Sequence, residues 1–203
     1  GLEDVPGERR AHYAGKSIAL VGGGFSAAAT VCQLVELAAD HPEMWVFWLT
    51  NGPRGAPLPR VTNDPLRERD RLAVKANSLA TRCDANLEFH PQTFLDEVVC
   101  HGPEQGFRLT GRSAGKPVTW EVERVIGCVG YRADLRLTAG LTVDEPAGRA
   151  ETREPGYYLL GAKSHGRDSG FLIRDGHEQV RTVFARVLGT PRLDLYTAVK
   201  KAA

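Results

Sequence analysis

The sequence predicts an α/β fold in which the strands of a parallel sheet alternate with helices. An apolar run at residues 16–21 ends in three consecutive glycines, and a helical pattern with one apolar face follows at once over residues 25–39. His41 and Pro42 end that pattern, and Met44–Leu49 is a continuous apolar run of the kind found in a buried parallel strand. The two runs and the helix between them form a βαβ unit.

The glycine turn has the sequence features of a dinucleotide-binding site. Gly22, Gly24 and Ala27 occupy the three small-residue positions of a G-x-G-x-x-G/A fingerprint, between a strand and a helix. Such a turn presents the free amide groups of a helix amino terminus to a phosphate. A plain surface turn is the alternative interpretation of a glycine triplet. The predicted nucleotide-binding residues of the turn are Gly22, Gly23, Gly24, Phe25, Ser26 and Ala27.

A loop and a second helix follow the βαβ unit. The loop is rich in Gly and Pro and runs from Asn51 to about Asn63. Asp64 is expected to cap the helix, with Pro65 at its first position. The face of this helix that we expect to be buried consists of Leu72, Ala76, Leu79, Ala80 and Cys83.

The chain then changes to short alternating runs separated by glycine-rich turns. This pattern, between residues 87 and 120, predicts a small antiparallel meander. Val125–Val129 is a further buried strand, which ends at Gly130. These elements predict a Rossmann-like, three-layer nucleotide-binding domain over residues 15–130. Residues 1–14 are expected to be a linker or lead-in segment because they lack sustained periodicity.

A second unit is expected over residues 131–203. Tyr157–Leu160 is a short apolar run that ends at Gly161 and predicts a strand. A further helix follows, with Asp175 and Glu178 as a cap pair at its start. Its apolar stripe consists of Val180, Val183, Phe184, Val187 and Leu188.

Composition excludes several classes of function. The chain has 26 basic and 25 acidic side chains, so we expect binding neither to nucleic acid nor to a membrane. The four cysteines include no C-x-x-C pair, which argues against a zinc site or a redox dithiol and suits a cytoplasmic protein. We expect a small-molecule substrate and no metal, and leave homo-oligomer formation open.

Three stretches together resemble a known superfamily: residues 21–28, residues 125–134, and residues 158–162 with 176–180. Their order is similar to that of the pyridine-nucleotide domain plus the carboxyl-terminal flavin segment of the two-dinucleotide-binding-domain flavoproteins. That superfamily includes flavin-dependent monooxygenases and thioredoxin-reductase-like oxidoreductases. The resemblance implies that the second unit is the carboxyl-terminal part of an FAD-binding domain.

The resemblance also implies roles for individual residues. Gly130 would be the crossover glycine between the two domains. Gly161 and Ala162 would approach the ribityl chain or pyrophosphate of FAD. Gln179 and Val180, in the first turn of the last helix, would meet the isoalloxazine ring. Many members have aspartate where this chain has Ala162, and alanine cannot accept a hydrogen bond from a ribityl hydroxyl.

The superfamily holds the ADP half of FAD with a separate amino-terminal glycine fingerprint. Residues 1–14 contain no such fingerprint, and the only methionine is Met44. We therefore expect the natural protein to extend upstream of Gly1.

The residues at the end of the second strand help to predict whether the nicotinamide cofactor is NAD or NADP. NAD-selective folds have Asp or Glu there, whereas this chain has Thr50 and Asn51. Arg54 and Arg60 follow in the loop, and a guanidinium group suits a 2′-phosphate. These residues favour NADP, with NAD as the alternative.

The resemblance implies an FAD-dependent NAD(P)H oxidoreductase. Hydride would pass from NADPH to the flavin and on to an unknown substrate or to oxygen, as in a monooxygenase. The alternative is a non-catalytic NAD(P)-binding sensor or docking module; a methyltransferase explains less of the chain. Because nicotinamide and flavin carry the electrons, no side chain is nominated as a catalytic acid or base. His165 could act beside the flavin or belong to a solvated loop.

Overall fold

The structure of the chain, a computed structural model, describes residues 3–53, 55–62, 64–82, 86–102, 104–131, 134, 136–138, 140, 154–165 and 170–196. It divides into two compact units, residues 1–130 and 131–203. The division falls between the same two residues as the boundary expected from the sequence. The assignment of each unit to one nucleotide stays a prediction.

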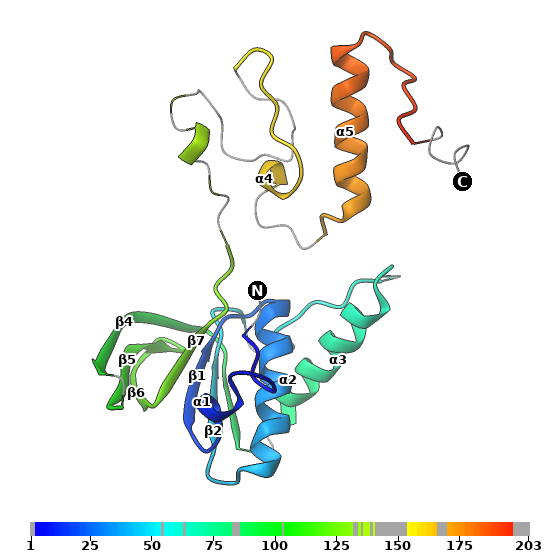
Figure 1. The fold of residues 1–203 in the computed structure, drawn as a ribbon. Helices are drawn as coiled ribbons and strands as arrows, with labels where there is room; N and C mark the ends of the chain where they lie inside the picture. Colours follow the sequence, from blue (N-terminus) through cyan, green and yellow to red (C-terminus); the bar gives the residue numbers. More distant parts are fainter. Residues whose placement is uncertain are drawn as a thin grey trace. The chain divides into compact units, whose positions relative to one another are not determined.

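The first unit is built around a four-stranded parallel sheet with the strand order β3-β2-β1-β7. Its strands are β1 (Ser17–Val21), β2 (Trp45–Leu49), β3 (Leu87–His90) and β7 (Arg124–Gly127). Two helices, α2 (Phe25–Asp40) and α3 (Arg67–Arg82), cover one face of this sheet (Figure 1). The predicted βαβ unit and returning strand are confirmed. The sequence did not predict β3 as a separate strand, because β3 has only four residues and is followed closely by the first strand of the meander.

An antiparallel meander covers the other face of the parallel sheet. Its strands are β4 (Thr93–Gly102), β5 (Gly106–Ser113) and β6 (Lys116–Val122), in that order. Ala19 and Leu49 of the parallel sheet pack against Leu109, Trp120 and Val122 of the meander. Helices, parallel sheet and meander therefore form three layers, as the sequence predicts.

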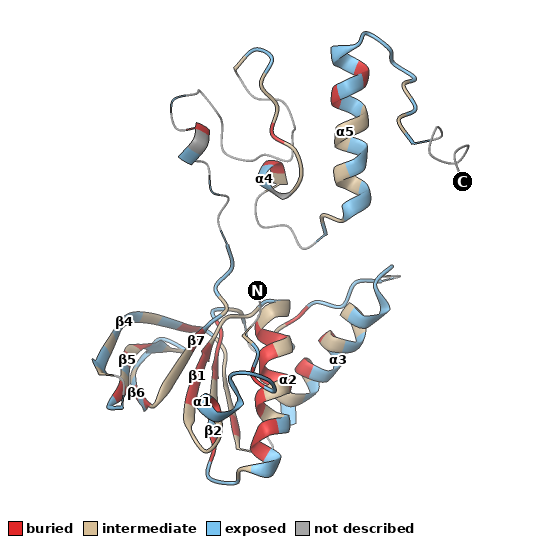
Figure 2. Ribbon diagram, viewed as in Figure 1, coloured by how far each residue is buried: buried red, intermediate tan, exposed pale blue. Residues whose placement is uncertain are grey.

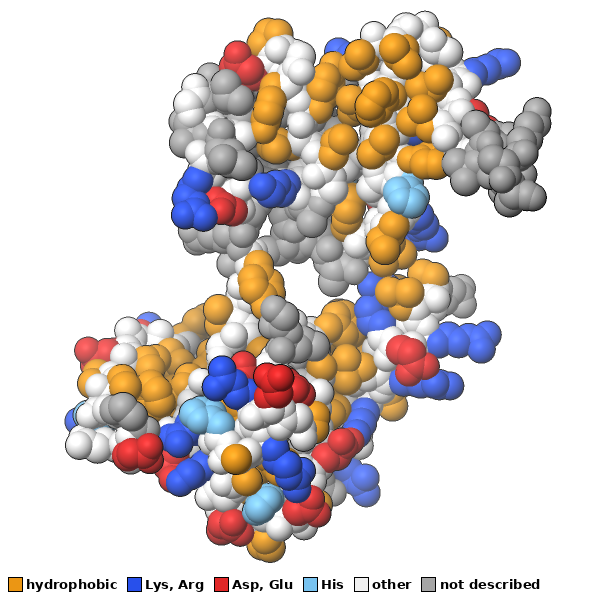
Figure 3. Space-filling view, in the orientation of Figure 1, with side chains coloured by type: hydrophobic (Ala, Val, Ile, Leu, Met, Phe, Trp, Pro, Cys, Tyr) orange, Lys and Arg blue, Asp and Glu red, His pale blue; other side chains and the backbone are white. Residues whose placement is uncertain are grey.

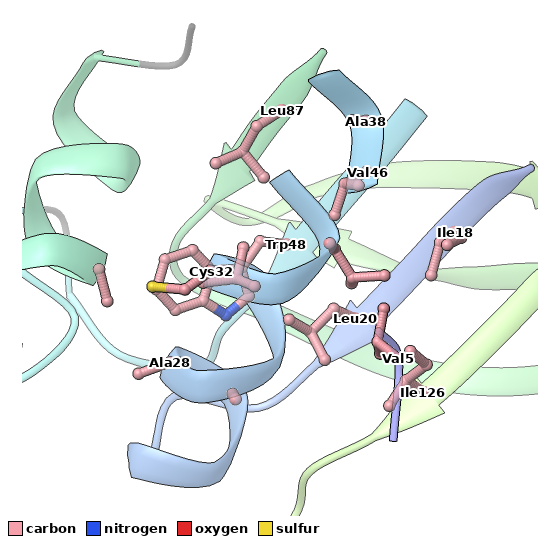
Figure 4. Packing of buried hydrophobic residues seen from close by; sticks show 14 of the residues in the cluster. Val5, Ile18, Leu20, Ala28, Cys32, Ala38, Val46, Trp48, Leu87 and Ile126 are labelled. Atoms are coloured by element: carbon pink, nitrogen blue, oxygen red, sulfur yellow. The ribbon is translucent and has the colours of Figure 1, made fainter. Parts of the chain in front are cut away.

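The larger core lies between the parallel sheet and its helices, where the buried residues of α2 face β1 and β2 (Figure 2). Trp48 is fully buried at its centre, and Leu20 and Cys32 lie around it (Figure 4). The Trp48 indole Nε1 donates a hydrogen bond of 2.8 Å to the carbonyl of Gly22. Trp45, on the same strand, is 39% exposed and donates to Glu88. Trp48 therefore links the core directly to the glycine turn.

The amino-terminal segment is part of the first unit rather than a loose linker. It contains a short helix, α1 (Arg10–Tyr13), and both Val5 and Tyr13 are buried in the helix-side core. The Tyr13 hydroxyl donates a hydrogen bond to Glu3, and burial raises the pKa of Tyr13 far above its ordinary value. This segment contains many charged residues and no periodic apolar pattern, so the sequence did not predict the burial of Val5 and Tyr13.

The start of α3 differs from the prediction. The helix begins at Arg67, two residues after Pro65, and the Asp64 carboxylate accepts a hydrogen bond from the Leu66 amide. The same carboxylate pairs with the Arg69 guanidinium at 2.6 Å, which lowers the pKa of Asp64. Ala76 and Ala80 are buried as expected, and Cys83 lies outside the described residues.

The second unit contains a 3₁₀ turn, η1 (Arg136–Thr138), and two helices, α4 (Ala162–His165) and α5 (Ile173–Val187). The strand predicted at 157–160 was wrong: the described part of this unit forms only an isolated bridge there, at Tyr158. Asp175 does cap α5, because its carboxylate accepts a hydrogen bond from the Leu172 amide at 2.7 Å. Glu178 pairs with Arg181 instead of capping.

The apolar stripe of α5 is only partly covered. Val183 is buried, as is Ala185, but Phe184 is 47% exposed and Val187 is 60% exposed. Figure 3 shows hydrophobic side chains gathered on the surface of the unit that contains α5. The described part of the second unit therefore has a much smaller core than the first.

We predict that Trp48→Phe lowers the free energy of unfolding by about 1–3 kcal/mol, because it removes buried ring atoms and leaves the Gly22 carbonyl without its donor. Trp45→Phe is the matched control on the same strand and should cost less than about 1 kcal/mol. Urea unfolding followed by circular dichroism would measure both. Equal losses would contradict the role assigned to Trp48.

Candidate functional site

The candidate site lies at the carboxyl-terminal edge of the parallel sheet, where α/β folds bind ligands. β1 continues there into the glycine turn. The Gly22 amide donates to the Leu49 carbonyl at 2.9 Å, and the Cys128 amide donates to the Val21 carbonyl at 2.7 Å. These bonds extend the strand pairing past the end of β1 and fix the start of the turn.

Gly22 is required by the packing of the turn. Its φ of +140° is a conformation that other residues rarely adopt. A Cβ on Gly22 would lie 2.3 Å from the Cys128 carbonyl oxygen, a distance that no side chain tolerates. This first glycine therefore lets β1 and the segment after β7 approach each other closely.

Gly24 has a different role. Its φ of −95° is ordinary, and a Cβ there would meet no atom within 4 Å. It is the N-cap residue of α2, yet no side chain caps the helix. The absence of a side chain at Gly24 thus leaves open space in front of a helix amino terminus, and a ligand can approach the backbone.

The first turn of α2 offers free backbone donors. The first intrahelical bond runs from the Ala28 amide to the Gly24 carbonyl, so the amides of Phe25, Ser26 and Ala27 have no helical carbonyl to bond. No acidic residue lies in this turn to offset the positive end of the helix dipole. Ala27 itself is fully buried, which makes the third small position a packing requirement. The predicted turn residues are thus brought together in a geometry that fits a phosphate.

Thr50 adds an unsatisfied group beside the turn. Its side chain is 3% exposed, and its hydroxyl has no hydrogen-bond partner among the described residues. A Cβ on Gly23 would lie 3.7 Å from the Thr50 Cβ, so the two residues are neighbours. Asn51 follows and is exposed. The end of β2 therefore carries no carboxylate for a ribose diol.

Basic residues line a hollow at the start of α3. The hollow has a volume of about 630 Å³ and is lined by Arg60, Val61, Thr62, Asp64, Arg67, Asp70 and Arg71. Arg60 binds Asp70 through two hydrogen bonds of 2.9 and 2.8 Å, which lower the pKa of Asp70. Arg69 connects this region to the glycine turn, because its guanidinium lies 5.8 Å from the centre of the Phe25 ring. Arg54 lies outside the described residues.

The cysteines near the site are packing residues. Cys128 lies 3.9 Å from the Thr30 hydroxyl, and burial raises the pKa of its thiol. Burial likewise raises the pKa of the Cys32 thiol. Within the described ranges no cysteine forms a disulfide, and no group of side chains is arranged to hold a metal ion.

The second unit brings together two of the residues that the resemblance singled out. The Gln179 side chain accepts a hydrogen bond of 2.8 Å from the Gly161 amide, and Gly161 has a φ of +71°. Gln179 lies in the second turn of α5, not the first, because the helix begins at Ile173. Val180 follows it and is partly exposed, Ala162 begins α4, and Gly130 ends the first unit. The buried Ser164, which the sequence interpretation did not single out, joins the same contacts.

None of the helices in the described part of the chain is long and apolar enough to cross a membrane. No known family profile matches the chain, and no curated protein matches it by sequence.

Several solved flavoprotein structures match most of the chain. The bacillithiol disulfide reductase Bdr from Bacillus cereus has a TM-score of 0.65 at 15% identity, covering 88% of this chain and 51% of that one. The FAD-bound cadaverine monooxygenase DfoA from Erwinia amylovora has a TM-score of 0.64 at 14% identity, covering 89% and 53%. The thioredoxin reductase from T. acidophilum has a TM-score of 0.56 at 18% identity, covering 89% and 55%.

These likenesses show the fold, and the chain spans about half the length of the structures it matches. The chain therefore shares its fold with about half of each of these flavoproteins, which agrees with the fold class that the order of its motifs predicts.

We predict that Gly24→Val folds with nearly unchanged stability but binds nucleotide at least about tenfold more weakly, because the new side chain fills the space before the α2 amides. Gly22→Ala should instead lower the free energy of unfolding by about 1–3 kcal/mol. Thermal unfolding and calorimetry with NADPH would separate the two effects. Unchanged nucleotide affinity in Gly24→Val would mean that the site lies elsewhere.

Proposed function

We propose that this chain binds NADPH at the glycine turn and forms part of an FAD-dependent NAD(P)H oxidoreductase. The observation that carries the proposal is the uncapped amino terminus of α2, with open space at Gly24 and free amides at Phe25, Ser26 and Ala27. A pyrophosphate offers the negative charge that this helix terminus lacks. The shared fold with flavoproteins supports the second half of the proposal.

Three features favour NADPH over NADH. Thr50 and Asn51 supply no carboxylate at the end of β2, where an acidic residue would accept both ribose hydroxyls of NADH. Arg60 and Arg67 line the hollow at the start of α3, and the Arg69–Phe25 contact brings that helix beside the glycine turn. Arginine suits a phosphate because its planar group can donate two hydrogen bonds at once.

The residues of this chain would bind and orient the cofactors rather than exchange protons. When bound, the nicotinamide supplies a hydride and the flavin accepts it. The α2 amides would fix the pyrophosphate, and the buried Ala27 would keep α2 against the sheet. The residues of the second unit that would meet the flavin are Gly161, Ala162, Gln179 and Val180.

The onward acceptor of the electrons would be an unknown small-molecule substrate or oxygen. The structural neighbours include both disulfide reductases and monooxygenases. The 203 residues contain no C-x-x-C pair, so we favour monooxygenation or simple reduction over dithiol chemistry. We also propose a cytoplasmic location, which suits cysteines that serve as packing residues.

A non-catalytic NAD(P)-binding module is the second candidate. The observation in its favour is the completeness of the first unit, whose three layers enclose their own core, whereas the described part of the second unit forms no sheet. Such a module would bind nucleotide without flavin and without turnover.

The visible spectrum of the protein expressed from its complete reading frame tests the flavin proposal. We expect flavin absorbance, either as purified or after FAD is added, and bleaching of that absorbance by NADPH in the absence of oxygen. Calorimetry with NADPH, NADH and FAD distinguishes the two candidates. NADPH binding without any FAD binding would favour the sensor module.

We predict that Arg60→Ala weakens NADPH binding about tenfold and leaves NADH binding unchanged, because only NADPH carries the 2′-phosphate. Asn51→Asp should shift the preference toward NADH, because a carboxylate at this exposed position can accept hydrogen bonds from the ribose hydroxyls. Dissociation constants for both nucleotides would measure the ratio. Equal losses for the two nucleotides in Arg60→Ala would contradict the assignment.

A further inference from the structure

A closed network of hydrogen bonds joins α5 to the turn at Gly161. Gln179 Oε1 accepts from the Gly161 amide at 2.8 Å, and Gln179 Nε2 donates to Ser164 Oγ at 2.7 Å. Ser164 Oγ in turn donates to the Gly161 carbonyl at 2.9 Å. Ser164 is 1% exposed, so the network is shielded from water. Each of its members has a partner, which makes the arrangement rigid.

The direction of every bond in this network follows from the backbone. An amide N–H can only donate, so the Gln179 atom facing Gly161 must be the carbonyl oxygen. The other end of the side chain is then an NH₂ group, which has two hydrogens and no acceptor capacity. One hydrogen goes to Ser164, and the second is left for another acceptor.

His165 provides that acceptor. Its Nδ1 lies 3.4 Å from Gln179 Nε2, the longest contact of the set. Because the Gln179 nitrogen can only donate, Nδ1 is favoured without a proton, and the proton of the neutral ring then lies on Nε2. Phe171 packs against the imidazole with ring centres 4.5 Å apart, which holds the plane of the ring.

The contacts with Gln179 and Phe171 thus favour one orientation and one tautomer of the His165 ring. The side chain is only partly buried, and no hydrogen bond from Nε2 to another residue is found in the described part of the chain. A fixed N–H donor of this kind suits a ligand atom that is a carbonyl oxygen or gains negative charge.

We propose that Gln179 is a positioning residue that fixes His165 as an Nε2–H donor, and that His165 donates this hydrogen bond to the bound flavin. The identity of the acceptor rests on the proposed function: a flavin ring carries carbonyl oxygens and becomes negatively charged when reduced. In this role the Gln179 side chain acts through His165, in addition to the contact with the flavin that the proposed function gives it.

The tautomer can be measured in the 203-residue chain without any flavin. In protein labelled with ¹⁵N-histidine, at a pH about two units above the ordinary imidazole pKa, the His165 signals should show a protonated Nε2 and an unprotonated Nδ1. Gln179→Glu should invert this pattern, because a carboxylate only accepts and therefore favours a proton on Nδ1. His165→Asn identifies the signals by removing them.

Glu178→Gln is the matched control, since Glu178 precedes Gln179 on the same helix but pairs with Arg181. It should leave the His165 signals unchanged. A protonated Nδ1 in the unaltered chain, or the same tautomer in Gln179→Glu, would overturn the proposed role of Gln179.

The acceptor is tested in the FAD-loaded protein by redox titration. His165→Phe keeps a ring against Phe171 but removes the donor, so it should weaken binding of reduced flavin about tenfold more than binding of oxidised flavin. The midpoint potential of the flavin would fall accordingly, and Gln179→Glu should shift it in the same direction. An unchanged potential in both variants would overturn the assignment of the flavin as acceptor. A protein that binds no FAD would overturn the proposed function as well, whereas the tautomer result would stand by itself.

Discussion

The first unit depends on the close approach of Gly22 to the backbone after β7. The glycine has a φ of +140°, and its missing Cβ leaves room for the Cys128 carbonyl. Trp48 donates to the Gly22 carbonyl from the core, so the turn is bonded to a fully buried side chain of β2. The direction in which the chain enters α2, and hence the position of its free amides, follows from these contacts.

The consecutive glycines of the turn therefore serve different purposes. Gly22 is a glycine because a side chain would clash with the backbone that follows β7. At Gly24, in contrast, a Cβ would contact no other atom. The open space at Gly24 leaves room for a ligand to approach the backbone at the start of α2. Thr50 adds to this, since a buried hydroxyl without a partner is uncommon in a protein interior. The nucleotide proposal thus rests on two independent features.

The second unit is ordered by polar contacts more than by a core. Its described buried side chains are few, and the apolar stripe of α5 is largely exposed at Phe184 and Val187. The contacts of Gln179 with Gly161 and Ser164 nevertheless define a single conformation for the turn, because each donor has one acceptor. The sequence predicts only a polar loop after Gly161, and these hydrogen bonds give its first residues a specific geometry.

The sequence by itself determined the βαβ unit, the meander and the glycine turn, because these follow from periodicity and from glycine positions within a short window. It misjudged the burial of Val5, which depends on residues distant in the chain. It also misjudged the start of α3, where Asp64 bonds to Leu66 and Arg69, and the isolated bridge at Tyr158. Only the tertiary structure decided that Gly22 packs against Cys128, that Arg69 lies beside Phe25, and that Gln179 meets Ser164 and His165. Each of these contacts joins residues well apart in the chain, and no local pattern specifies which side chains will meet.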